Sequence, residues 1–284
     1  MCEAVHTNIT EGNQSTTEVR FGKDYYNYFD TKTYLNSYFT GISEETPSHS
    51  QFAMRNFHEA WSKMPEGNLR VLEFGGGPNI SALISAEPYS KEIIFAEYSE
   101  RNRREVEEWL QNSPDSHDWS SYFNFVVQNL EGKTSEEVSI RQEALRKKVT
   151  HILSCDIGWE DPVKWPSSWS TQIRSFDVIT TNLCLEASVT STEDYRHAIA
   201  KLSRYLKAGG YFVMLGVLGE SFYMVGNEKF YCFPLSKSII EETFAEEGYQ
   251  ILDLKVFTLD PTVTKGNCNA EGLFFFRGRF DAHA

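Results

Sequence analysis

The sequence predicts one α/β domain of the doubly wound class, in which helices cover both faces of a mostly parallel sheet. From Val71 onward, short apolar runs alternate with stretches of helical period, which is typical of βα units. A glycine-rich segment follows the first run, and acidic or amide residues follow three later runs. With 284 residues, of which 40% are hydrophobic, the chain can bury a substantial core.

Eight apolar runs are predicted as strands. The first six are expected to form the parallel part of the sheet: Val71–Phe74, Ile93–Glu97, Phe123–Val127, His151–Ser154, Phe176–Thr181 and Tyr211–Val217. The last two runs, Ile251–Phe257 and Gly272–Phe280, are joined by a segment too short for a crossover helix. They are therefore expected to pair antiparallel at the end of the sheet.

Four stretches between these runs are predicted as helices: Ser99–Gln111, Ser135–Val149, Tyr195–Leu206 and Ser236–Glu247. In the first, apolar residues recur at helical spacing and Ser99 is the expected N-cap. The second is heavily charged, which favours a solvated surface helix. The third is expected to end at Gly209 and Gly210, because glycine adopts the left-handed conformation that terminates helices.

The N-terminal part divides into two segments. Residues 1–22 are polar and aperiodic, so we expect a flexible tail followed by one domain over residues 23–284. Seven aromatic residues fall within Tyr25–Phe39. Such a density indicates an element that is buried or that covers a ligand.

Composition excludes several partners. Lysine and arginine number 27 against 40 acidic residues, a net charge of −13 that repels nucleic acids and anionic membrane surfaces. The longest apolar run, near Tyr211 to Leu218, is too short to span a bilayer, and no basic and apolar leader opens the sequence, so a cytoplasmic location is expected. Five scattered cysteines without a Cys-x-x-Cys pair predict neither a disulfide framework nor a metal site.

The sharpest local motif is Val71–Asn79, a predicted strand that runs into three glycines and then a helix expected near Pro78. Glycines at this point let a ligand lie against the backbone. Gly75 and Gly77 fit the first two positions of a dinucleotide-binding G-x-G-x-x-G, but Ile80 occupies the third. A tight turn without a ligand would also explain the glycines.

Polar residues at three later strand ends point to a nucleoside. Glu97 lies 22 positions after Gly75, where a carboxylate that binds ribose hydroxyls is expected. Asp156 can accept a hydrogen bond from an adenine amino group, Ile157 can cover the ring, and Asn182 ends the next run. Each could be ordinary turn chemistry, but together they mark the carboxyl ends of strands, where open α/β sheets bind ligands.

At this level of detail the chain resembles the small-molecule N-methyltransferases that include the nicotinamide, phenylethanolamine and indolethylamine enzymes. The resemblance extends from about Tyr25 to Phe276. It rests on Tyr34-Leu35 with Tyr38, Glu73–Pro78, Glu97-Tyr98-Ser99 with Asn102, His117–Ser120, Leu130-Glu131-Gly132, Cys155-Asp156-Ile157, Leu183–Ala187, Leu206–Gly210, Tyr223–Gly226 and Glu271–Phe274. It implies a class I methyltransferase sheet, an N-terminal helical lid over about residues 23–65, and a monomer.

The resemblance also implies S-adenosyl-L-methionine as the methyl donor and S-adenosyl-L-homocysteine as the product. The residues it assigns to the donor are Tyr26, Tyr34, Gly75, Gly77, Glu97, Tyr98, Asn102, Asp156, Ile157 and Asn182. Relatives carry tyrosines where this chain has Phe39 and Ser81. The loss of two phenols near the methionine carboxylate implies weaker donor binding.

The implied acceptor is a small amine or N-heterocycle, with Glu186 as the catalytic base or positioner. Tyr38, Glu186, Gly216, Tyr223 and Cys232 are expected to line its pocket. Gly216 and Cys232 replace an Asp and a Ser of the nicotinamide enzyme. Gly219 replaces a Glu of the phenylethanolamine enzyme, and Cys268-Asn269 replace its acidic pair, so most amine-facing carboxylates are expected to be missing.

Three hypotheses therefore stand. The first is an N-methyltransferase for an amine or azaheterocycle. The second is a catalytically silent relative that binds the donor or serves as an interaction module, which the altered pocket would explain. The third is a nicotinamide-dinucleotide oxidoreductase, against which Ile80 argues.

Overall fold

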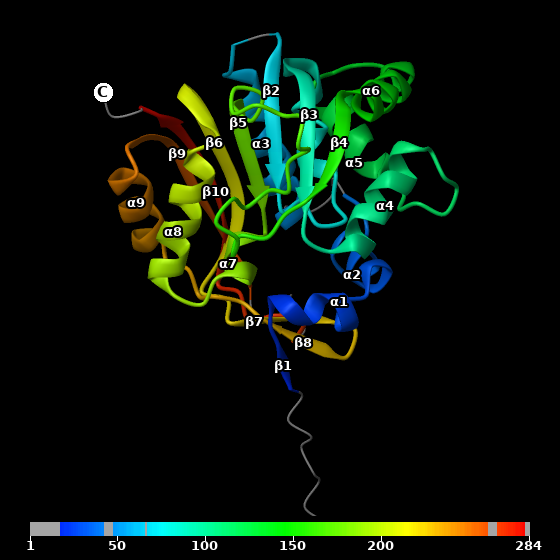
Figure 1. Ribbon diagram of the computed structural model, residues 1–284. Coiled ribbons are helices and arrows are strands. Elements are labelled where there is room, and N and C mark those ends of the chain that lie inside the picture. Colours follow the sequence, from blue (N-terminus) through cyan, green and yellow to red (C-terminus); the bar gives the residue numbers. More distant parts are fainter. Residues whose placement is uncertain (1–17, 43–47, 66, 261–265, 282–284) are drawn as a thin grey trace, which may run out of the picture.

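The computed structural model describes residues 18–42, 48–65, 67–260 and 266–281. Its main sheet has the strand order β4-β3-β2-β5-β6-β10-β9 (Figure 1). The strands are β2 (Leu69–Phe74), β3 (Ser90–Glu97), β4 (Val149–Ser154), β5 (Phe176–Asn182), β6 (Leu206–Leu218), β9 (Tyr249–Thr258) and β10 (Gly272–Phe280). Strands β2, β3, β4, β5 and β6 form the parallel part of the sheet, and β10 pairs antiparallel with both β6 and β9. The predicted doubly wound sheet is therefore confirmed.

Alternating residues of the central strands face two separate cores. Val71 and Ile93 pack on one side, with α3 (His49–Ser62), α4 (Glu100–Leu110), α5 (Ser120–Asn124) and α6 (Ser135–Lys148). Leu72 and Ile94 pack on the other, with α7 (Leu185–Ser188), α8 (Thr192–Ser203) and α9 (Lys237–Glu246). Continuous apolar runs are what a parallel strand buried on both faces requires.

A small second layer, here called the cover, lies at one end of the sheet beside α7 (Figure 1). The cover consists of β1 (Val19–Arg20), a short 3₁₀ turn (Gly22–Asp24), α1 (Tyr25–Tyr28), α2 (Thr31–Tyr38), β7 (Phe222–Val225) and β8 (Glu228–Tyr231). Strand β8 pairs with β1 on one side and β7 on the other. Because α7 directly follows β5, the cover lies over the carboxyl ends of the parallel strands.

Contacts from both sides hold the cover in place. Arg20 Nε donates to Glu228 Oε2 at 2.9 Å, which joins β1 to β8. Thr31 Oγ1 donates to Asn102 Oδ1 at 2.8 Å, which joins α2 to α4. The Tyr38 hydroxyl donates to the Met224 carbonyl at 2.9 Å. The aromatic segment is thus a covering element, as its composition predicts.

The predicted boundary between tail and domain is wrong by a few residues. Residues 1–17 lie outside the described part of the chain, but β1 and the 3₁₀ turn fall within the predicted tail. Phe21 stacks on Tyr231 at 5.0 Å between ring centroids. The edge of β8 supplies hydrogen-bond partners that no local pattern reveals. Helix α3, within the predicted lid, buries Phe57 and Trp61 in the core.

The predicted strand at Phe123–Val127 is wrong. The segment forms the end of α5 and a π-helical turn at Phe125–Leu130. Tyr122, Phe123, Phe125, Val126 and Val127 are all buried, so the helical segment is enclosed on most sides and its apolar run is continuous. A short apolar run does not by itself distinguish a strand from a buried helical turn.

Two helix boundaries also differ from expectation. No α-helix follows the glycines at Pro78, because the Asn79 side chain accepts from Ser81 N at 2.8 Å and favours a turn before a 3₁₀ segment at Ser81–Leu83. Helix α8 ends at Ser203, not at the paired glycines. Gly210 lies in β6, where a Cβ would be 2.9 Å from the Asp177 carbonyl oxygen.

The remaining helices are confirmed within a few residues. Helix α4 begins after Ser99, although the serine hydroxyl makes no capping hydrogen bond. Helix α6 is less solvated than its charge predicts, because Arg141 is buried and pairs with Glu87 and Glu131 at 2.8 and 2.7 Å. None of the helices in the described ranges has the length and apolarity needed to cross a membrane.

The buried Arg141 gives a stability prediction. R141M would leave the nearly buried carboxylates of Glu87 and Glu131 with Lys148 and Lys133 as their remaining ion-pair partners, so we expect a loss of about 2 kcal/mol in the free energy of unfolding. R104M breaks an ion pair whose side chains are both 69% exposed and should cost less than about 1 kcal/mol. Urea unfolding of both variants measures the difference, and equal losses would contradict the assignment.

Candidate active site

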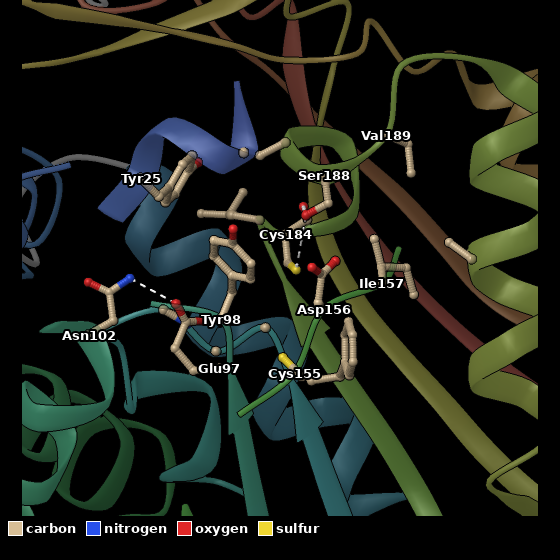
Figure 2. A pocket seen from close by; sticks show the side chains of 18 of the residues that line it. Tyr25, Glu97, Tyr98, Asn102, Cys155, Asp156, Ile157, Cys184, Ser188 and Val189 are labelled. Atoms are coloured by element: carbon tan, nitrogen blue, oxygen red, sulfur yellow. Dashed lines mark hydrogen bonds between the residues drawn. The ribbon is translucent and has the colours of Figure 1, made fainter. Parts of the chain in front are cut away.

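A cavity of about 640 Å³, here called the outer cavity, lies at the carboxyl ends of β2, β3, β4 and β5. The segments that directly follow these strands line it, together with residues of the cover (Figure 2). This is where open α/β sheets place their ligands. The predicted strand-end residues thus lie at a cavity of this kind.

The glycine segment after β2 forms the floor of the outer cavity. Gly75 has φ +66°, and a Cβ there would be 2.0 Å from Cys184 Sγ. Gly77 has φ +61°, yet a Cβ there would meet nothing within 4 Å. Since Gly77 lines the cavity, that open space is the cavity itself, and a ligand can lie directly against the backbone.

Glu97 presents a fixed carboxylate at the end of β3. Its Oε2 accepts from Gly77 N at 3.0 Å, and its Oε1 accepts from Ser99 N at 2.9 Å and Asn102 Nδ2 at 3.0 Å (Figure 2). Burial raises the pKa of Glu97, and these donors oppose the rise. Oε1 already accepts two hydrogen bonds, whereas Oε2 accepts the one from Gly77 N and retains capacity for a further one, as from a ribose hydroxyl.

The segment after β4 adds a carboxylate and an apolar side chain. Asp156 Oδ1 accepts from Gly158 N at 2.8 Å, and Lys201 Nζ donates to the Ile157 carbonyl at 2.9 Å. These bonds hold the loop at the cavity, where Figure 2 places Asp156 and Ile157 side by side with Tyr98 nearby. An aromatic base with an exocyclic amino group fits such a surface.

A second cavity of about 230 Å³, here called the inner cavity, adjoins the first. Six residues line both cavities and form what we call the shared wall: Tyr34, Asn79, Asn182, Leu183, Ala187 and Tyr223. Leu183 has φ +50°, a left-handed conformation that branched residues rarely adopt. Backbone strain of this kind persists only where the surroundings enforce it, and it concentrates at functional sites.

Glu186 lies at the inner cavity with one oxygen available. The side chain is 1% exposed, and its Oε1 accepts from Val217 N at 2.9 Å. Its Oε2 is buried and has no hydrogen-bond partner among the described residues. Burial raises the pKa of Glu186 to about 7. The group can therefore hold or release a proton near neutral pH.

A second carboxyl group, Glu220, faces the same cavity. It is 6% exposed and accepts hydrogen bonds from the thiols of Cys232 and Cys268. Burial raises the pKa of Glu220 to about 7 and that of Cys268 to about 11, so the thiols keep their protons. Within the described part of the chain, no lysine or arginine lines the inner cavity.

His49, which also lines the inner cavity, does not compensate these acids. Burial lowers the pKa of its imidazole, which favours the neutral form. The inner cavity is thus acidic, with two carboxyl groups and no cation in its described lining. A positively charged ligand would supply the missing charge.

Most residues singled out from the sequence line these cavities. The outer cavity has Tyr34, Gly75, Gly77, Glu97, Tyr98, Asn102, Asp156, Ile157 and Asn182, and the inner cavity has Tyr34, Tyr38, Asn182, Glu186, Tyr223 and Cys232. Two residues line neither. Tyr26 is 46% exposed and packs its ring on Tyr98 at 5.0 Å, and Gly216 lies under Phe274, whose ring a Cβ would approach to 2.5 Å.

Sequence reasoning missed Glu220. The loss of a carboxylate at Gly219 suggested that the amine-facing acids are absent there, but the next residue supplies one to the cavity. The available signal was an acidic residue three positions after the predicted strand Tyr211–Val217. Phe39 and Ser81, noted as departures near the donor, line the inner cavity here.

Within the described ranges, no group of three or more His, Cys, Asp or Glu residues is arranged to hold a metal ion. Cys155, Cys184, Cys232 and Cys268 are free thiols.

Comparison with known proteins bears on this geometry. The model of the NNMT/PNMT/TEMT family matches residues 17–279. Indolethylamine N-methyltransferase of Mus musculus is 31% identical over 91% of this chain and 95% of its own length. Nicotinamide N-methyltransferase of Homo sapiens is 29% identical over 88% of this chain and 92% of its own length. Phenylethanolamine N-methyltransferase of Sus scrofa is 25% identical over 88% of each chain.

Solved structures agree on the fold. An S-adenosylmethionine-dependent methyltransferase from Clostridium acetobutylicum superposes with a TM-score of 0.52 at 12% identity, covering 88% of this chain and 99% of its own. The [4+2]-cyclase SpnF superposes with a TM-score of 0.56 at 15% identity, covering 94% of this chain and 99% of its own. Because a cyclase shares the fold, architecture alone does not define the reaction.

Two glycines of the floor give a prediction. G77A adds a methyl group inside the outer cavity, so we expect at least a tenfold loss of S-adenosylhomocysteine affinity together with about 1 kcal/mol of backbone strain. G132A, at φ +68° with nothing within 4 Å, carries the same strain outside the cavity and should keep the affinity. G75A should destabilise most, because its Cβ overlaps Cys184 Sγ. Calorimetric titration and thermal unfolding measure these effects, and unchanged affinity in G77A would contradict the assignment of the floor.

Proposed function

The chain belongs to the NNMT/PNMT/TEMT family, and on this premise we propose how its two cavities divide the work of an S-adenosylmethionine-dependent N-methyltransferase. The outer cavity holds the methyl donor, and the inner cavity holds the nitrogen of a small molecule. The observation that carries the proposal is the shared wall, because residues that line both cavities bring the two cavities, and a ligand in each, next to one another.

The residues of the outer cavity fit the donor. Gly77 leaves open backbone, Glu97 offers carboxylate oxygens to a ribose, and Asp156 offers one to an adenine amino group. Asn182 brings an amide oxygen that is buried without a partner among the described residues. Bound S-adenosylmethionine supplies an electrophilic methyl group on a positively charged sulfur.

The chain's own contribution to methyl transfer is alignment and exclusion of water. Displacement at the methyl carbon needs the acceptor nitrogen in line with the bond that breaks, and no nucleophilic side chain. Tyr34, Leu183 and Tyr223 of the shared wall confine the path between the cavities. The hydroxyl groups of Tyr25 and Tyr223 contact each other, which ties the cover to the wall.

We propose a small amine as the acceptor. An amine is protonated at neutral pH, and the acidic inner cavity favours that cation over a neutral azaheterocycle. The amine must lose a proton before its lone pair can attack. Glu186 Oε2 is free to accept that proton, while Glu220 holds the charge of the bound amine.

A catalytically silent relative remains the second candidate function. The observations that favour it are Phe39 and Ser81 in place of phenols and the enclosed inner cavity of only about 230 Å³. Such a protein would bind the donor and transfer nothing. It would keep the outer cavity and its ligand, so binding alone does not separate the two functions.

A panel of small amines and pyridines, incubated with donor labelled in its methyl group, tests the proposal. We expect labelled product with at least one primary or secondary amine and a lower kcat/KM for nicotinamide-like acceptors. Labelled product from pyridines alone would overturn the amine assignment. Donor binding without transfer to any member would favour the silent relative.

The pH dependence follows from the two raised pKa values. Glu186 and Glu220 are neutral below about pH 7 and ionise above it, so the cavity gains its negative charge as the pH rises through 7. We expect kcat/KM for an amine to increase with pH below about 7, with a limiting logarithmic slope of about two, and to level off above. A profile that falls between pH 5 and 7 would contradict the roles of these acids.

Substitutions distinguish the roles of Glu186 and Glu220. E186Q removes the proton acceptor, so we expect kcat to fall about 10²-fold or more. E220Q removes charge and should raise the amine KM about tenfold while it reduces the pH slope to about one. Neither residue lines the outer cavity, so S-adenosylhomocysteine affinity, measured by calorimetry, is the control for folding. Equal kcat in wild type and E186Q would remove Glu186 from the mechanism.

A further inference from the structure

One buried acid near the active site has no role in the mechanism above. Glu73, the penultimate residue of β2, is 1% exposed and lines neither cavity. It accepts hydrogen bonds from Thr180 Oγ1 and from Asn182 Nδ2, the latter at 2.7 Å. Burial raises the pKa of Glu73 to about 7, so the protein tolerates a costly group at this position.

Glu73 determines how the Asn182 amide lies. Both ends of an amide have nearly the same shape, so packing alone does not fix which end faces which way. In its ionised form the carboxylate accepts from Nδ2 and has no proton to donate to Oδ1, so it selects one orientation. Oδ1 is then left as a buried acceptor with no partner among the described residues.

Asn182 lies where the two ligands would meet. It belongs to the shared wall and directly precedes Leu183, whose left-handed backbone turns the chain at this point. An amide oxygen in this wall is the negative end of a dipole beside the path of the methyl group. An amide nitrogen in the same place would be its positive end.

We propose that Glu73 is a positioning residue for methyl transfer, which orients the Asn182 amide so that its oxygen faces the positively charged sulfur of the donor. This inference rests on the proposed function. A fixed dipole in a site without water interacts with charge more strongly than one that must reorient. The product S-adenosylhomocysteine lacks the positive charge on sulfur, so a correctly oriented amide oxygen favours donor over product.

The ratio of the two affinities therefore reports the orientation of the amide. E73M removes the acceptor at similar size and lets the amide turn, and N182A removes the amide. We expect each to lower the S-adenosylmethionine to S-adenosylhomocysteine affinity ratio about five- to tenfold, as expected for one charge–dipole contact in an enclosed site. The double variant should fall no further than N182A, because Glu73 acts only through Asn182.

Two matched variants keep the test falsifiable. E73Q retains an oxygen for Asn182 Nδ2, while its nitrogen can donate to the Thr180 hydroxyl, and should keep the ratio within about twofold of wild type. T180V removes the other partner of Glu73 and should leave the ratio unchanged. If E73M does not fold, the contrast between N182A and T180V decides the matter.

Calorimetric titration with both nucleosides gives the result without any turnover. Equal loss of the two affinities in N182A, or an additive double variant, would overturn the inference and leave the proposed function intact. Wild-type protein that binds neither nucleoside would overturn the proposed function and the inference with it.

Discussion

Burial of carboxyl groups that have no ion-pair partner among the described residues is the constraint on which the active end of this protein depends. Glu73, Glu97, Glu186 and Glu220 are all nearly inaccessible to solvent, and burial raises the pKa of each. Their partners are backbone amides, two asparagines, a hydroxyl and thiols. Elsewhere the chain buries Glu87 against the guanidinium of Arg141. Neutral donors hold a carboxylate in place without neutralising its charge, so the three of these groups that line a cavity, Glu97, Glu186 and Glu220, remain attractive to cationic ligands.

The parallel sheet and the outer cavity could be predicted because their signals are local. Glycines after a buried run, and acids after the next two, mark strand ends whatever the rest of the chain does, and Glu97 and Asp156 line the cavity as that pattern implies. The errors occur where local patterns are degenerate. Phe123–Val127 satisfies both strand and helix, and Val19–Arg20 becomes a strand only because β8 offers an edge.

The inner cavity was less predictable because its lining comes from distant parts of the chain. Its residues belong to α2, α3, the end of β5, the segment after β6 and the segment before β10. Glu220 becomes an acceptor-facing group only when the cavity closes around it with Cys232 and Cys268. Gly216, in contrast, lines neither cavity, and a Cβ there would be 2.5 Å from the Phe274 ring and 2.9 Å from Glu186 Oε1. No spacing rule in the sequence carries this information.

Protonation of the buried carboxyl groups couples the stability of the fold to ligand binding in the inner cavity. A raised carboxyl pKa means that the folded state holds a proton that the unfolded chain would release, so these groups lower stability as the pH rises from about 4.5 to 7. A cation bound beside Glu186 or Glu220 stabilises the ionised form and opposes that loss. Binding of a protonated amine should therefore release a proton from Glu186 or Glu220 and at the same time stabilise the folded state. The acidity that makes the inner cavity costly to bury is thus the property that lets it bind an amine and then accept the amine's proton.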